Sequence, residues 1–479
     1  MVFSSIEFLW FFFPVVLVLY ALVPPGGRNL LLALSSLVFY AWGAHAIVFV
    51  FIASIVINYL AGRMIGHLRE RRRDRSARRV MWAAVVVDLA LLFTWKYTVF
   101  ATYQLDRVIG WFGDRHAIPL PAITLPIGIS FFTFHAISYV VDTARGEAPP
   151  MRRIHDFAQY MAFFPQLIAG PIIRYHQIDD QIRHPPPRSQ RVSDLADGFP
   201  RFALGLSKKV LIADQVGHIA DAAFANTHGL STPAAWLGAL AYTVQIYFDF
   251  SGYSDMAIGM ARMFGFRFPE NFNRPYSSVS LTDFWRRWHM TLSRWFRDYV
   301  YIPIGGNRGT RIRTSGNLLF VFLLTGLWHG AAWTFVLWGL YHGAVLLIER
   351  ISGVARWPDA RFAALRRALA LLLVIIGWVL FRASTIGDAA RVYEAMLPLH
   401  FHALSPAVHA ALNRETVGAL LIGLLTVLLP RDLVLGRVVL DGRWAGRPLA
   451  ARLAAVAILP LAAISVAAGS FSPFLYFRF

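Results

Sequence analysis

The chain has 479 residues, of which 57% are hydrophobic and 15% are charged, with a formal net charge of +19. Soluble proteins carry about a quarter charged residues, so this composition indicates a membrane protein, and we expect one integral membrane domain over residues 1–479. The sequence has no cysteine, which excludes disulfides, thiolate nucleophiles and cysteine-bound metals. Its basic residues lie between the apolar runs, as in cytoplasmic loops of membrane proteins, so we expect no nucleic-acid partner.

Apolar runs long enough to cross a bilayer recur along the whole chain. A hydrocarbon core about 30 Å thick needs roughly 20 apolar residues per helix. The first run follows a segment with Glu7 and no basic residue, and it meets Pro24 and Pro25 rather than a cleavage site, so we expect an uncleaved span. The candidate spans lie near residues 7–23, 30–43, 45–62, 81–100, 122–141, 208–224, 233–250, 316–332, 333–349, 369–383, 415–429 and 452–469.

The arginines predict how these spans are oriented. Residues 63–79 contain eight arginines against Glu70 and Asp74, and cytoplasmic loops are enriched in such residues. We call the segments between these spans gaps. If every arginine-rich gap lies in the cytoplasm, the chain crosses the membrane about 12 times and its N-terminus is outside. The other basic gaps are 145–153, 174–201, 262–313, 350–367 and 431–452, and the gaps poor in basic charge are 101–118, 225–232 and 384–414.

One apolar segment interrupts this alternation. Residues 154–171 have basic gaps on both sides, so both ends belong to the cytoplasm. A re-entrant helix broken at Pro165 and Gly170 satisfies this, and such irregular backbone must be buried in protein or line a cavity. An amphipathic helix on the membrane surface is the alternative.

The cytoplasmic-side region 251–315 is too aromatic to be a plain linker. If it is helical, one face carries Trp, Trp, His, Leu, Trp, Phe and Tyr at positions 285, 288, 289, 292, 295, 296 and 299. We expect an amphipathic or re-entrant helix with this face buried. The charged residues off that face are Asp283, Arg286, Arg287, Arg294 and Arg297.

Two histidines are candidates for chemistry. The helical period turns His289 inward, where a lone histidine is usually a hydrogen-bonded core residue. His329 lies late in an apolar run between small residues, which leave room for another backbone or for a substrate. Imidazole titrates near neutrality and therefore suits a general base.

Other polar residues lie in apolar surroundings and could orient a buried histidine. An aspartate beside a histidine can do so, but structural pairs that hold helices together are the favoured interpretation. No metal-ligand spacing such as HExxH occurs, so we expect no metal. The residues concerned are Asp249, Asp255, Lys96, Asp142, His135 and His342.

A glycine-rich basic loop spans residues 303–309. Its backbone N–H groups and arginines could hold the phosphates of a nucleotide-bearing donor such as coenzyme A, although a plain turn with cytoplasmic charge explains the loop equally well. The candidate donor-binding residues on this loop and on the arginine face of region 251–315 are Arg286, Arg287, Arg294, Asn307 and Arg308.

Taken in order, several segments resemble the membrane-bound O-acyltransferase (MBOAT) superfamily, and its bacterial polysaccharide-acetylating branch in particular. The resemblance extends over nearly the whole chain. Its segments are MVFSSIEFLWFFFP, RNLLLALSSLVFYAWG, LPIGISFFTFHAISYVVDTARG, FFPQLIAGPIIRY, IYFDFSGYSDMAIGMARMFGF, NFNRPYSSVSLTDFWRRWHMTLSRWFRDYVYIPIGGNR, GLWHGAAWTFVLWG and SPFLYFRF.

The resemblance implies a fold, a reaction and partners. The fold would be an all-α ring of about 11–12 transmembrane helices in the bacterial inner membrane, with a periplasmic N-terminus. His329 would be the catalytic histidine, acting as general base or carrying the acyl group itself. His289 would be the second functional histidine, positioning the thioester or polarising its carbonyl. Acetyl-CoA would be the donor. The acceptor would be a polysaccharide, such as alginate, or periplasmic acetyl-transfer proteins of the AlgJ, AlgX and AlgF type.

Other functions stay open at this level. Within the superfamily, D-alanyl transfer towards teichoic acid would use an acyl-carrier protein, whose acidity suits the arginine-rich face. Acylation of a membrane lipid, a lysophospholipid, is a further possibility. From another class, a polysaccharide transporter or export channel would also have about twelve spans, but transporters often contain internal repeats and none is visible here. Arg478 leaves the role of the C-terminal tail undecided.

Overall fold

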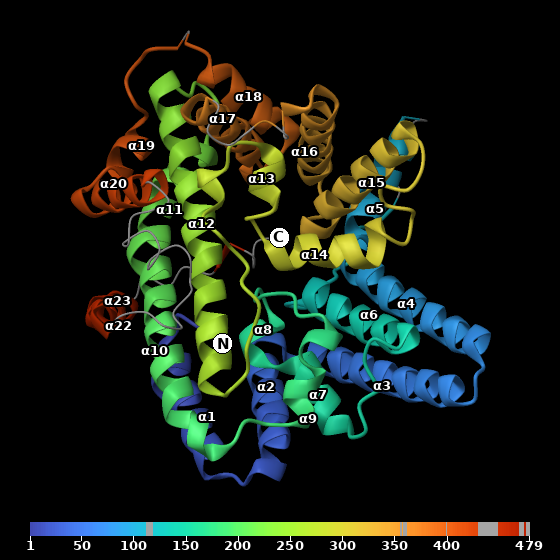
Figure 1. Cartoon of the computed structure of the whole chain (residues 1–479). Helices are drawn as coiled ribbons and strands as arrows, with labels where there is room; N and C mark the ends of the chain where they lie inside the picture. The colour runs from blue at the N-terminus through green and yellow to red at the C-terminus, as the bar shows by residue number, and fades with distance from the viewer. Residues whose placement is uncertain are drawn as a thin grey trace. The chain divides into compact units, whose positions relative to one another are not determined.

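The computed structural model describes residues 1–111, 118–354, 357, 362–398, 400–429, 449–468 and 474–475. These residues form helices joined by short loops, with no strand among them, which confirms the all-α fold class (Figure 1). They divide into two compact units. Unit 1 comprises residues 1–196 and 260–268, and unit 2 comprises residues 197–259 and 269–479.

Unit 1 contains most of the N-terminal helices. Among them α3, α4 and α6 lie side by side (Figure 1). The elements are η1 Glu7–Phe12, α1 Phe13–Leu22, η2 Pro25–Gly27, α2 Arg28–Ala44, η3 His45–Ile47, α3 Val48–Glu70, α4 Asp74–Lys96, α5 Thr98–Gly110, α6 Ile129–Arg145, α7 Ile154–Ala162, α8 Phe164–Leu167, η4 Tyr175–Gln177, α9 Asp179–Arg183 and η5 Arg188–Gln190.

Several expected spans of unit 1 end at identifiable breaks. Residues 25–70 form an apolar helical stretch of 46 residues, about 70 Å if continuous and so twice the thickness of a bilayer. His45 has φ +45° and separates α2 from α3, as the two expected spans 30–43 and 45–62 require. Helices α4 and α5 bend by 63° at Tyr97, so the expected span 81–100 stops at this break.

The segment 154–171 is a broken helix whose second half is completely buried. Helix α7 ends at Phe163, whose extended ψ of 109° starts the short helix α8. Every residue from Gln159 to Pro171 is buried. A helix lying on a membrane surface would expose a polar face, so this burial favours the re-entrant interpretation.

The chain enters unit 2 within α10, and unit 2 contains the remaining helices. The elements are α10 Arg191–Ser207, η6 Lys208–Ala213, α11 Asp214–Ala225, α12 Thr232–Met263, η7 Pro275–Ser277, α13 Leu281–Trp285, α14 Met290–Phe296, η8 Arg297–Tyr301, α15 Arg311–His329, α16 Trp333–Ser352, α17 Ala363–Arg382, α18 Ile386–Met396, α19 Pro406–Ala411, α20 Arg414–Leu428, α22 Leu449–Ala457 and α23 Leu459–Ala467.

By length and hydropathy alone, three helical stretches of the described chain can cross a membrane. They are residues 25–70, α16 and α17, and the bent pair α4 and α5 is a fourth if taken as one span. Most other expected spans coincide with helices that are shorter, bent or more polar. The basic gap 431–448 and the last four residues lie outside the described part of the chain.

The single amphipathic helix expected around residue 289 is wrong. The chain forms α13, a turn and α14 instead, and His289 has the left-handed φ of +41° at the break. The loop before α13 causes the break, because the N–H of Asn273 donates to the carbonyl of Arg287 and the N–H of Met290 donates to that of Asn271. The expected buried face is nonetheless correct, since only Tyr299 among its seven residues is half-buried and the rest are buried.

Candidate active site

The packing of α15 against α16 places His329. A Cβ atom at Gly326 would overlap the carbonyl oxygen of Phe335, and one at Gly339 would overlap that of Phe322. The two backbones therefore touch, and the small residues near His329 make room for a neighbouring helix. His329 follows one turn after Gly326, as the last residue of α15.

Aromatic rings surround His329. The rings of Trp328, Trp338 and Phe381 lie with their centroids 4.9, 5.1 and 5.0 Å from the imidazole, each close to edge-on. His329 retains an exposed fraction of 6%, so it is buried without being fully sealed.

His289 is fully buried and its proton can be placed. Its Nδ1 lies 3.0 Å from Oδ1 of Asn271, which also accepts the backbone N–H of Thr291. A backbone N–H can only donate, so this atom of Asn271 is the oxygen and His289 carries its proton on Nδ1. Burial lowers the pKa of His289 to about 3, which keeps the imidazole neutral. Nε2 is then the atom with the free electron pair.

This tautomer changes the role expected for His289. A neutral imidazole with its proton on Nδ1 can accept a hydrogen bond at Nε2 but cannot donate one to an oxyanion. The expectation that His289 polarises a carbonyl therefore does not suit the geometry. Asn271, which sequence reasoning missed, fixes the tautomer, and a left-handed histidine at a helix break is the kind of local strain that clusters at functional sites.

The two candidate histidines share one neighbour. The centroid of the Trp328 ring lies 6.0 Å from that of His289 and 4.9 Å from that of His329. The aromatic pattern predicted His289 to be inside, the apolar run predicted the same for His329, and the structure brings both to the same indole.

A third buried histidine lies one helical turn beyond Trp338 on α16. His342 has no exposed surface, and within the described ranges neither ring nitrogen has a hydrogen-bond partner. Trp338 separates its ring from that of His329, and Trp285 contacts it edge-on at 5.2 Å. We call His289, His329, His342 and the tryptophans 285, 328 and 338 the histidine layer.

A cavity of about 470 Å³ opens beside this layer. Trp285 and Phe322 line it, and two guanidinium groups, those of Arg286 and Arg350, lie on its wall together with Asn307. Glu349 fixes this wall, because its carboxylate accepts the backbone N–H groups of Leu281 and Thr282 at 2.6 and 2.9 Å and so holds the first turn of α13.

The cavity contains two of the five expected donor-binding residues. Arg286 is exposed and has no ion-pair partner in the described part of the chain, and Asn307 accepts a hydrogen bond from Arg350 at 3.3 Å. Arg287 pairs with Asp283 at 2.7 Å, and neither it nor Arg294 or Arg308 lines the cavity. Sequence reasoning missed Arg350, which stands at the end of an apolar run and had been counted only as cytoplasmic charge.

A buried group of charges joins α10, η6 and α12, which approach closely at Gly205 and Gly252. Lys208 contacts Asp255 at 2.6 Å, and Lys209 lies between two carboxylates at 2.6 and 2.7 Å. We call this group the ion-pair cluster; its members are Arg201, Lys208, Lys209, Asp214, Asp249, Asp255 and Glu270. The aspartates thus pair with lysine and arginine, as the structural interpretation predicts.

The C-terminal segment reaches the ion-pair cluster. The N–H of Leu475 donates to Oδ2 of Asp249 at 3.0 Å, and Nζ of Lys209 lies 4.6 Å from the centre of the Phe474 ring. The two residues are buried, so this part of the tail belongs to the core of unit 2.

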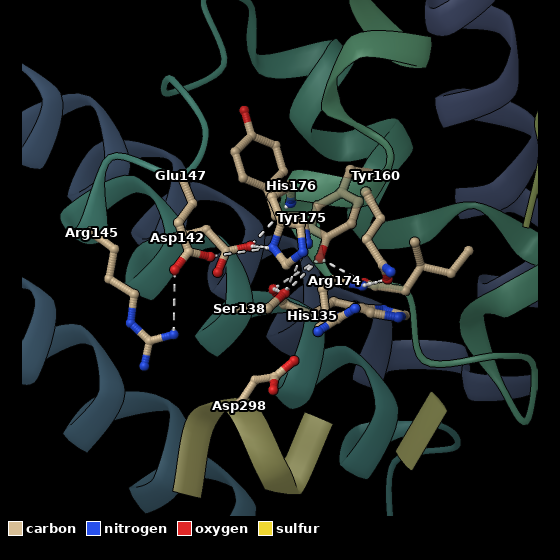
Figure 2. Close-up of polar contacts among 12 residues, drawn as sticks. His135, Ser138, Asp142, Arg145, Glu147, Tyr160, Arg174, Tyr175, His176 and Asp298 are labelled. Atoms are coloured by element: carbon tan, nitrogen blue, oxygen red, sulfur yellow. Dashed lines mark hydrogen bonds and ion pairs between the residues drawn. The ribbon is translucent and has the colours of Figure 1, made fainter. Parts of the chain in front are cut away.

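Unit 1 has its own polar group, on α6 and the loop after α8 (Figure 2). Asp142 is buried and accepts both the backbone N–H and Nδ1 of His176, at 3.0 and 2.9 Å. Oε2 of Glu147 lies 3.5 Å from the same Nδ1, and Arg145 lies 3.7 Å from Glu147. Three possible metal-ligand atoms thus lie within 4.8 Å of one another, but each already has a partner within the group, which is the pattern of a structural clamp.

The chain is similar in sequence to one family model and to several known proteins. A sequence model of the membrane-bound O-acyltransferase family matches residues 128–381. A protein of Azotobacter vinelandii named "Probable alginate O-acetylase AlgI" is 44% identical, with both chains covered completely. Its namesake from Pseudomonas aeruginosa is 47% identical over 89% of this chain and 81% of its own. A peptidoglycan O-acetyltransferase of Helicobacter pylori is 35% identical over 84% of this chain and 80% of its own.

The match to the family model includes His289, His329, Asn271 and the walls of the 470 Å³ cavity. More than half of the chain is therefore matched, and relatives are similar from end to end. The protein is a membrane-bound O-acyltransferase, a member of the MBOAT family.

Proposed function

We propose that the protein transfers an acetyl group from cytoplasmic acetyl-CoA to a hydroxyl outside the inner membrane, on a polysaccharide such as alginate or on a periplasmic relay protein. The observation that carries this is the convergence of His289 and His329 on Trp328 beside a cavity with free positive charge. The similarity to alginate O-acetylases supports the acetyl group and the polysaccharide.

His329 acts as the general base in this proposal. It takes the proton of the acceptor hydroxyl while the oxygen attacks the thioester carbonyl; the carbon–sulfur bond then breaks and the proton passes to the departing thiolate. His289, with its proton on Nδ1, accepts a hydrogen bond at Nε2 and orients the hydroxyl or the base. The aromatic rings around His329 exclude water, which would otherwise hydrolyse the thioester.

The donor enters through the cavity of α13, α15 and α16. Its phosphates would contact Arg286 and Arg350, while the thioester arm follows Trp285 towards Trp338 and His329. The nucleotide stays outside because phosphates cannot cross an apolar core cheaply, whereas an acetyl group can. Cytoplasmic placement of this cavity requires the N-terminus to be periplasmic, as the arginine distribution predicts.

The two units act together as one membrane domain over residues 1–479. The family match runs through parts of each, which supports a shared function. D-alanyl transfer is the alternative within the family, with an acyl-carrier protein as donor, and more distant relatives include teichoic acid D-alanyltransferases. Transfer from purified acetyl-CoA separates the two, because the carrier-dependent reaction would not use it.

The test is His329→Ala in a polysaccharide-producing cell that lacks its own acetylase. We expect O-acetyl content to fall by at least about 100-fold, since a positioned base contributes roughly 10²–10⁴ in rate. His409→Ala, an exposed histidine on α19, is the matched control and keeps full acetylation. Wild-type acetylation by a normally inserted His329→Ala protein would refute the proposal, and loss of polymer export in this variant would favour a transporter.

A further inference from the structure

The cavity of about 580 Å³ in unit 1 is separate from the residues assigned to acyl transfer. Three segments far apart in sequence form its walls: residues 25–29 where α2 begins, residues 151–156 before and within α7, and residues 182–185 at the end of α9 and just after it. The arginine distribution assigns each of these segments to the cytoplasmic side, and the structure brings them together. The cavity therefore lies at the level of the lipid headgroups or just outside it.

Its walls carry positive charge that the protein does not neutralise. Arg152 and Arg153 line the cavity and are exposed, and neither guanidinium has an ion-pair or hydrogen-bond partner among the described residues. Arg183 also lines it but is occupied, since its guanidinium contacts the carbonyl of Pro149 at 2.7 Å and Asp179 at 3.7 Å. Two arginines thus remain to bind an anion.

The same cavity offers acceptors as well as donors. Asn29 is 92% buried, and its amide donates to Asp156 and to the carbonyl of Ile182, both at 2.8 Å. Its Oδ1 has no hydrogen-bond partner in the described part of the chain, and a buried acceptor without a partner is destabilising unless a ligand supplies a donor. Asn29 and Asp156 would therefore suit a ligand with hydroxyl groups beside its phosphate.

Apolar helix surfaces continue from this cavity. Val18 and Leu22 on α1 and Leu30 and Leu34 on α2 are exposed, and the residues that join these two helices form one cavity wall. In a membrane such side chains face acyl chains, which a free phosphate compound does not have. The neighbouring surface thus favours a lipid as the source of the phosphate.

We propose that this cavity binds the headgroup of an anionic glycerophospholipid that carries free hydroxyls, of the phosphatidylglycerol type. Arg152 and Arg153 hold its phosphate, Asn29 and Asp156 accept its hydroxyls, and its acyl chains lie along α1 and α2. Basic pockets at the cytoplasmic ends of transmembrane helices recognise lipids in this way. The lipid would tie the start of α2, α7 and the loop after α9 together.

Native mass spectrometry of the detergent-purified full chain tests this directly. With short-chain phosphatidylglycerol, we expect one tightly retained lipid, and roughly 30-fold weaker binding in the double variant Arg152→Ala/Arg153→Ala, because each arginine near a lipid phosphate contributes about fivefold. Arg78→Ala/Arg79→Ala removes the same charge from exposed positions of α4 away from the cavity, and it keeps wild-type binding.

Three comparison ligands identify the source of the phosphate. Phosphatidylcholine, which is neutral and lacks hydroxyls, should bind at least about tenfold more weakly. Glycerophosphoglycerol and inorganic phosphate, which lack acyl chains, should not compete at equal concentration. Equal loss of binding in both double variants, equal binding of phosphatidylcholine or full competition by inorganic phosphate would each overturn the proposal. The readout is binding, so it is independent of acyl transfer.

Discussion

The ion-pair cluster and the histidine layer are two polar regions buried in the same unit, and they manage polarity in opposite ways. The cluster keeps full charges and matches each lysine with carboxylates at 2.6–2.7 Å. In the layer, the partner shown for His289 is the neutral amide of Asn271, and aromatic rings surround His329 and His342. Buried charge in the cluster is paired with opposite charge, whereas the base that we propose in the layer must be a neutral imidazole in order to take up a proton.

The largest effect on stability should come from removing a carboxylate from the ion-pair cluster. Asp255→Ala removes the carboxylate shared by Arg201 and Lys208, both nearly fully buried. Breaking a buried ion pair leaves an uncompensated charge and costs about 3–5 kcal/mol, so we expect a lower melting temperature or no folded protein. Thermal unfolding of the detergent-purified variant measures this.

The matched control is an ion pair of nearly the same length with more solvent around it. Asp283 and Arg287 lie 2.7 Å apart and are each about one fifth exposed. Because solvent screens such a pair, Asp283→Ala should cost about 1 kcal/mol or less. If both aspartate variants lost the same stability, the contrast between the cluster and ordinary surface charge would be wrong.

The next largest effect should come from a negative charge introduced beside His289 in the histidine layer. Asn271→Asp keeps the shape of the side chain but places a carboxylate 3.0 Å from Nδ1 of His289. An adjacent negative charge favours the imidazolium, so the pKa of His289 should rise from about 3 towards or above its ordinary value near 6.5. As pH falls through the raised pKa, Nε2 becomes protonated and can no longer accept a hydrogen bond.

The measurement is the ratio of acetyl-transfer rates at pH 6 and pH 8. We expect this ratio to fall about tenfold in Asn271→Asp relative to the wild type, whose His289 stays neutral at both values. Asn273→Asp adds the same charge two residues away, where the described chain shows only backbone hydrogen bonds for Asn273, and it should leave the ratio unchanged. If both variants changed the ratio equally, an added negative charge anywhere in this segment, and not its contact with His289, would explain the pH dependence.

The sequence predicted which side chains are buried better than it predicted the backbone that buries them. The aromatic period placed His289 inside correctly, because burial follows hydrophobic pattern even where a helix breaks. The break itself depends on hydrogen bonds from residues 271 and 273 to a segment more than ten residues later, which no local pattern reveals. The pairing of Asp249 and Asp255 is likewise expected, but their lysine and arginine partners lie 40 to 54 residues away and could not be named.

The candidate donor-binding residues show a second limit of prediction from the sequence. Charge and the glycine-rich loop selected four arginines and Asn307, yet only Arg286 and Asn307 among them line the cavity. Arg287 is occupied by Asp283, whereas Arg286, its neighbour in sequence, faces the cavity. Arg350 joins it only because α13 and α16 pack together through Glu349. The charge of a segment could be predicted, but the geometry that selects among its arginines required the fold.

The smallest effect should come from the rim of the 470 Å³ cavity, where we propose that the donor binds and which belongs to neither buried region. Arg286→Ala removes an exposed guanidinium, and one solvent-exposed contact to a phosphate contributes about 1 kcal/mol, so KM for acetyl-CoA should rise roughly fivefold with kcat within about twofold. Arg297→Ala, an exposed arginine paired with Asp298 outside the cavity, should change neither constant. Acetyl-pantetheine, which lacks the nucleotide and its phosphates, should be used equally well by Arg286→Ala and the wild type. A loss of kcat with acetyl-pantetheine would place Arg286 in the chemistry instead, and the division between a charged rim and a neutral reacting layer would then not hold.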